Sequence, residues 1–95
     1  MINLFYSKLR IHFMYEILQK ARDKGILNKS RTAMLISLIE TGDVTCKICG
    51  KRINELKEVS CDHIIPISKG GKKWDIKNFQ LAHKKCNYKK GNKLL

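Results

Sequence analysis

Residues 61–93 read CDHIIPISKGGKKWDIKNFQLAHKKCNYKKGNK and hold most of the side chains that can bind a metal ion or move a proton. An aspartate and a histidine are adjacent at Asp62-His63, and a histidine, a cysteine and an asparagine stand among lysines near the end. Upstream, Cys46-x-x-Cys49 supplies two more soft ligands. A chain of 95 residues buries only a modest core, so a bound metal would contribute much of its stability.

Two pairs of these ligands have the spacing of zinc knuckles. Cys46 and Cys49 are separated by two residues, which lets both thiolates face one tetrahedral ion. A redox dithiol has the same spacing, but it normally opens a helix in a βαβ unit, and no such pattern is present. His83-x-x-Cys86 supplies the matching pair, so the spacing predicts a structural Zn²⁺ site of three cysteines and one histidine. Cys61 is the alternative to His83, although its place outside both pairs favours a small apolar strand residue.

Hydrophobic spacing predicts two helices ahead of the first knuckle. One covers 8–23 and is followed by Gly25, a residue common just past a helix end. A second is expected over about 31–41, with Ser30 as its N-cap and Gly42 after its end. This second helix is apolar almost all round and is expected to be buried. The two helices either pack on the zinc-binding part or form a dimer or partner surface.

The second half of the chain predicts two short strands and a third helix. Residues 57–61 and 78–82 are expected to pair, and residues 83–90 are expected to form a short helix that ends at Gly91. The expected fold class is therefore α+β. The expected domain organisation is a helical extension over residues 1–44 and one small domain over residues 45–95.

A polar loop with three lysines joins the two strands at 68–73. Trp74 and Ile76 follow it, and both are expected to anchor the far side of the loop in the core. Trp74 has an alternative role, which is to stack on a base.

Charge is concentrated in the same half. The net charge is +12, of which residues 1–45 contribute +3 and residues 46–95 contribute +9. Such an excess is typical either of a well-solvated surface or of a protein that binds a polyanion. Here the lysines surround the candidate metal site, which favours nucleic acid. The candidate phosphate contacts are Lys84, Lys85, Lys89, Lys90 and Lys93.

The chain carries no pattern for export or membrane insertion. No apolar run reaches the roughly 18 residues of a membrane span, and the N-terminal residues lack a small-residue cleavage site. Cysteines without an export signal predict a reducing, cytoplasmic location. We expect no membrane partner.

Three of the residues suit phosphodiester hydrolysis. The imidazole of His63 can deprotonate a water molecule. The carboxylate of Asp62 and the carboxamide of Asn87 offer the oxygen ligands that hard divalent cations prefer. The sequence therefore predicts a catalytic cation, Mg²⁺ or Mn²⁺, in addition to the structural Zn²⁺.

The segments DHIIP, GG, NFQL and HxxCNYKKG occur in the order and spacing of the HNH nuclease motif, and the chain resembles that family over about residues 46–93. The resemblance implies a ββα-metal fold with His63 as general base and Asn78 holding the loop that aims it. It also implies that Asp62 and Asn87 bind the catalytic ion. The position of His83 is more often a cysteine in the family.

We expect a small HNH endonuclease that nicks or cuts DNA, from a phage or mobile element or from a related homing, restriction, packaging or toxin context. The first alternative is a zinc-knuckle module that binds nucleic acid without cleaving it. The second is a zinc-stabilised protein-interaction domain, which the charge of residues 46–95 disfavours.

Overall fold

The structure is a computed structural model that describes residues 4–93, with side chains from residue 12 onward. Over these residues three α-helices and a two-stranded antiparallel sheet form an α+β fold, as the sequence predicts. The helices and strands are α1 (Leu4–Asp23), α2 (Lys29–Thr41), β1 (Val59–His63), β2 (Phe79–His83) and α3 (Lys84–Lys90). Three short 3₁₀ helices are η1 (Leu56–Glu58), η2 (Ile67–Lys69) and η3 (Ile76–Asn78).

The start of α2 differs from the prediction. Asn28 is the N-cap, and its side-chain oxygen accepts a hydrogen bond of 2.8 Å from the backbone N–H of Arg31. Ser30, the expected cap, already lies inside the helix, because α2 begins at Lys29. The other end is as predicted. Gly42 adopts a left-handed conformation (φ 74°) that glycine tolerates without strain.

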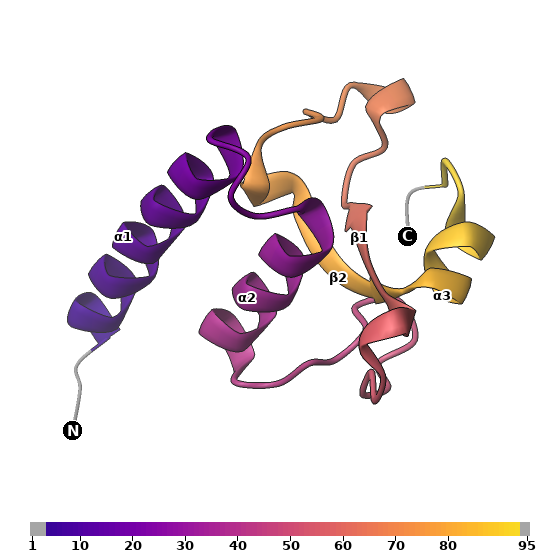
Figure 1. The fold of residues 1–95 in the computed structure, drawn as a ribbon, viewed down its shortest axis with the longest axis horizontal. Helices are drawn as coiled ribbons and strands as arrows, with labels where there is room; N and C mark the ends of the chain where they lie inside the picture. Colours follow the sequence, from indigo (N-terminus) through magenta and orange to yellow (C-terminus); the bar gives the residue numbers. More distant parts are fainter. Residues whose placement is uncertain (1–3, 94–95) are drawn as a thin grey trace.

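Helix α1 begins earlier than the predicted residue 8 and stands apart from the sheet, packing on α2 and on η3 (Figure 1). Leu18 is its buried anchor at 6% exposure. The apolar side chains of Phe13, Met14 and Ile17 are exposed instead. They are compatible with the dimer surface considered above, which remains a prediction.

The two strands pair with Val59 opposite His83 and His63 opposite Phe79. They begin two residues and one residue later than predicted. In the view of Figure 1, α2 and α3 lie on opposite sides of this sheet, and both contact its two strands. The sheet is thus the element that brings the end of β1 next to α3.

Helix α2 is part of the core. Its buried side chains enter two clusters, one around the knuckle and the strands and one that reaches α1 and η3. The first cluster contains Ala33, Cys46, Ile53, Val59, Leu81 and Ala82; the second contains Leu18, Ile36, Ile76 and Phe79. Ile76 is buried as predicted. A domain boundary at residue 45 remains a prediction. Residues on both sides of it share these clusters, because α2 and the sheet contribute to both.

No helix in the described part of the chain combines the length and apolarity that crossing a bilayer requires.

The α2 cap supports a direct stability test. Asn28→Ala should lower the free energy of unfolding by about 1 kcal/mol, because the N–H of Arg31 loses its acceptor. Ser30→Ala, the matched control, should change it by less than about 0.5 kcal/mol. Urea unfolding of the two variants measures both values, and a larger loss in Ser30→Ala would contradict the cap assignment.

Candidate metal centre and active site

Four side chains converge where the knuckle meets the junction of β2 and α3. The ligand atoms of Cys46, Cys49, His83 and Cys86 all lie within 4.8 Å of one another. The Nδ1 atom of His83 is 3.4 Å from the sulfur of Cys49 and 3.9 Å from that of Cys86. A zinc tetrahedron with bonds of about 2.3 Å to sulfur has edges of about 3.8 Å. The group therefore fits one Zn²⁺ in both donor type and spacing.

The knuckle reaches this geometry through a tight turn. Thr45 and Arg52 form an isolated antiparallel bridge across it, and Gly50 turns the chain with a φ of 77°. The N–H of Gly50 donates to the carbonyl of Cys46 at 2.9 Å. A residue with a Cβ atom would be strained at this φ, which explains the glycine after the second cysteine.

Backbone amides stabilise the thiolate form of Cys46. Burial alone would raise its pKa, but hydrogen bonds from the backbone N–H groups of Cys49, His83 and Ile48 outweigh burial and lower the pKa to about 6. The first two of these N–H groups lie 3.5 and 3.4 Å from the sulfur. Since the thiolate is the form that binds Zn²⁺, the fold favours the ligand state.

Cys61 lies outside this group, as its place outside both ligand pairs in the sequence predicts. It is half-buried and packs against both hydrophobic clusters. Burial raises the pKa of its thiol to about 12, so it stays protonated at neutral pH. It therefore acts as a small apolar residue of β1, and His83 completes the ligand set.

His63 is the last residue of β1 and is held in one orientation. Its Nε2 atom lies 3.0 Å from the carbonyl oxygen of Lys73, and its ring meets Phe79 edge-on at 5.5 Å between centroids. A carbonyl oxygen only accepts hydrogen bonds, so Nε2 carries the proton in the neutral ring. Nδ1 then holds the lone pair and is the proton acceptor.

Asn78 ties together the two sides of the loop between the strands. Its side-chain oxygen accepts from the N–H of Ile65 at 2.9 Å. Its side-chain nitrogen donates to the carbonyls of Ile65 at 3.0 Å and of Lys72 at 3.1 Å. Lys72 precedes the residue whose carbonyl holds the His63 ring, so Asn78 fixes the backbone that orients this histidine.

Asp62 is 4% exposed, and one of its oxygens is fully engaged. Oδ2 accepts from Nε2 of Gln80 at 2.7 Å and from the ammonium of Lys90 at 2.8 Å. The same ammonium donates to the carbonyl of His63 at 2.8 Å. The buried carboxylate is thus neutralised by a buried lysine from α3.

Asn87 faces Asp62 and His63 across a small cavity of about 180 Å³ that all three line. Its side-chain nitrogen donates to the carbonyl of Cys61 at 3.2 Å and to the hydroxyl of Ser60 at 3.4 Å. Its own oxygen therefore remains an acceptor. Carboxylate and amide oxygens such as those of Asp62 and Asn87 are the ligand type that hard divalent cations prefer.

The HNH endonuclease family model matches residues 46–93, just over half of the chain. The chain belongs to the HNH endonuclease family. Comparisons with curated proteins and with solved structures found no match. Membership implies nuclease-type activity and a nucleic-acid partner, and the zinc-competent cluster is consistent with both.

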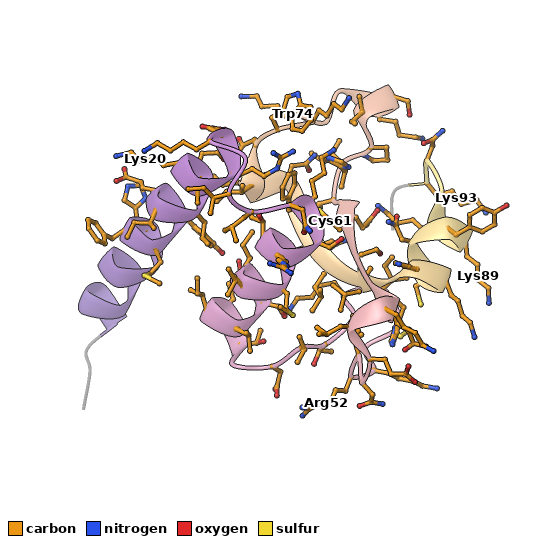
Figure 2. All side chains as sticks on the ribbon, in the orientation of Figure 1. Lys20, Arg52, Cys61, Trp74, Lys89 and Lys93 are labelled. Atoms are coloured by element: carbon orange, nitrogen blue, oxygen red, sulfur yellow. The ribbon has the colours of Figure 1, made fainter. Side chains whose placement is uncertain are left out.

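The lysines of this HNH chain separate into two kinds. Four of the predicted phosphate contacts have exposed side chains, and Figure 2 draws Lys89 and Lys93 pointing outward beside α3. These four are Lys84, Lys85, Lys89 and Lys93. Lys90 differs from the expectation, because its ammonium is buried against Asp62 and is not available to a phosphate.

The sequence patterns assigned no role to Gln80 at the HNH site and predicted a different role for Lys90. Gln80 pairs with Asp62 in the strand register, so a polar residue opposite the aspartate was a usable signal. Lys90 lies three residues after Asn87 and thus on the same face of α3. Nothing in the run of lysines distinguishes it from its exposed neighbour Lys89.

The zinc ligands lead to a first prediction for this site. Purified protein should retain about one zinc per chain, and Cys46→Ser should lower both zinc content and folded fraction, since metal binding is coupled to folding. Cys61→Ala is the matched control and should keep the metal. Metal analysis after dialysis measures both. Loss of zinc from Cys61→Ala alone would overturn the ligand set.

The buried ion pair of Asp62 and Lys90 leads to a second prediction for this site. Lys90→Met leaves the Asp62 carboxylate buried without a counter-charge and should destabilise the fold by about 3–5 kcal/mol. Lys89→Met, at the exposed neighbour on the same helix, should be nearly neutral. Chemical unfolding of the two variants gives the comparison, and equal small effects would mean that the pair is not formed.

Proposed function

We propose that the protein is a metal-dependent endonuclease that hydrolyses DNA phosphodiester bonds, with His63 as the general base. The observation that carries this proposal is the shared cavity. His63, Asp62 and Asn87 line the same small cavity. A base and a hard-cation site within one cavity are what hydrolysis of a phosphodiester requires.

In this proposal Nδ1 of His63 accepts a proton from the attacking water. The carbonyl of Lys73 accepts from Nε2, which selects the tautomer with a free Nδ1. The same carbonyl dipole stabilises the imidazolium as it forms. Asn78 acts as a positioning residue, since its hydrogen bonds to both sides of the loop keep this carbonyl in place.

Asp62 and Asn87 would hold the catalytic cation, Mg²⁺ or Mn²⁺. When bound, it supplies positive charge for the phosphate and for the leaving 3′ oxygen. Gln80 and Lys90 hold the Asp62 carboxylate through Oδ2, which leaves Oδ1 as the ligand atom. In this arrangement one oxygen of Asp62 accepts the structural hydrogen bonds, and the other would bind the ion.

The exposed lysines beside α3 are proposed to contact backbone phosphates. Such contacts position DNA without reading its sequence, so this surface favours broad rather than base-specific binding. No disulfide links the four cysteines among the described residues, which suits the proposed reducing, cytoplasmic setting.

A plasmid cleavage assay tests the proposed base. His63→Ala should cut supercoiled DNA about 10²–10⁴-fold more slowly, while zinc content, folding and DNA binding stay near normal. His12→Ala, which changes an exposed histidine of α1, is the matched control and should retain full activity.

A metal titration of Asn87→Ala separates ligand from base. This variant should need more Mg²⁺ or Mn²⁺ for half-maximal rate, because one oxygen ligand is gone. The His63→Ala defect should not respond to added metal. Wild-type rates in His63→Ala would refute His63 as the general base. Absence of metal-dependent cleavage by the wild-type protein would favour a zinc-knuckle module that only binds nucleic acid.

A further inference from the structure

Three cationic side chains surround the indole of Trp74. The guanidinium carbon of Arg22 lies 4.6 Å from the ring centroid, the ammonium of Lys29 lies 4.5 Å from it, and that of Lys73 lies 5.0 Å from it. They come from the end of α1, the start of α2 and the loop between the strands. We refer to Arg22, Lys29, Lys73 and Trp74 as the indole cluster. Trp74 is 52% exposed, which corrects its expected burial in the core.

The indole cluster lacks a counter-charge of its own. None of the ion pairs among the described residues includes its three cations. Asp23 and Asp75, the nearest carboxylates in the sequence, are absent from these ion pairs; Asp23 accepts from Gln19 and Asp75 from the N–H of Lys77. A π-system attracts cations through its quadrupole, but it cancels none of their charge.

Two further observations agree with an unfilled anion site. The buried Nε of Arg22 has no hydrogen-bond partner among the described residues. Burial, followed by the charges of Lys73 and Arg22, lowers the pKa of Lys29. A bound anion would reduce the repulsion among these like charges.

The indole cluster is tied to the proposed catalytic base. Lys73 provides both one of the cations and the carbonyl that accepts from His63. On the other side, Gln19 of α1 donates to the carbonyl of Trp74 at 3.2 Å and accepts from the N–H of Ile76 at 3.1 Å. These bonds lock α1 to the loop, so the cluster holds a fixed position relative to the active site.

We propose that the indole cluster binds a second backbone phosphate of the DNA that is cut, beside the scissile one. This inference rests on the proposed nuclease function and assigns α1 and α2 a role in holding the substrate. The cations lie over the ring itself, where they would compete with a stacked base. Trp74 therefore organises the cations, and the phosphate supplies the missing charge.

Salt-dependent DNA binding tests the site. Zinc-loaded His63→Ala protein with all 95 residues is titrated with a short duplex at several salt concentrations, so that little cleavage occurs. Adding Lys29→Gln or Lys73→Gln should weaken binding and reduce the slope of log Kd against log salt by about 1. Lys51→Gln, an equal charge change at an exposed knuckle lysine, should leave the slope unchanged.

An arginine pair provides the second comparison. Arg22→Gln should behave like the lysine variants, and Arg52→Gln should not. Figure 2 shows Arg52 at the opposite end of the molecule from Trp74. Slopes that change no more in the cluster variants than in these controls would overturn the phosphate site.

The fluorescence of Trp74, the single tryptophan of the chain, distinguishes phosphate from base. Single strands with and without bases should perturb it equally if the indole cluster binds phosphate. A response that requires bases would refute the proposal in favour of stacking. Plasmid cleavage by protein with His63 intact is scored separately, so that a failed phosphate site and a failed nuclease assignment give different results.

Discussion

The zinc-competent cluster joins two segments that are far apart in the sequence, and the active site depends on this junction. Helix α3 has only seven residues, which is too short to be stable alone. Its first turn is fixed by His83 and Cys86 on one side and by the knuckle on the other. Asn87 and Lys90 follow directly, so a metal bound by this group would hold the start of α3. It would thereby set where Lys90 meets Asp62 and where Asn87 meets Cys61.

A second constraint is electrostatic. Asp62 and Lys90 are both almost fully buried, and each would be costly alone. Their pairing adds little net stability compared with an apolar pair, but it specifies a single arrangement of β1 and α3. Gln80 occupies the same carboxylate oxygen from the neighbouring strand. The proposed cation would use the other oxygen, so the structural and the proposed chemical roles of this side chain do not compete.

The sequence predicts features whose determinants are local or strongly patterned. The ligand spacing identifies the zinc group, glycines mark the ends of α2 and α3, and the segments 57–61 and 78–82 predict the strands to within two residues. The predictions were wrong where contacts between residues far apart in the sequence determine the structure. In the sequence Trp74 resembles a core residue, but in the fold cations from α1 and α2 lie against its ring. Lys90 resembles its neighbours in the sequence, but the fold buries it. The cap of α2 was misplaced because Asn28 and Ser30 are both good N-cap residues.

Amide hydrogen exchange, followed residue by residue with and without zinc, tests the central claim that the metal group positions the active site. Chelation should accelerate exchange across β1, β2 and α3 together, and readdition of zinc should restore protection, because these elements form one cooperative unit around the metal. Exchange that changes only in the knuckle, with α3 still protected after zinc is removed, would contradict it.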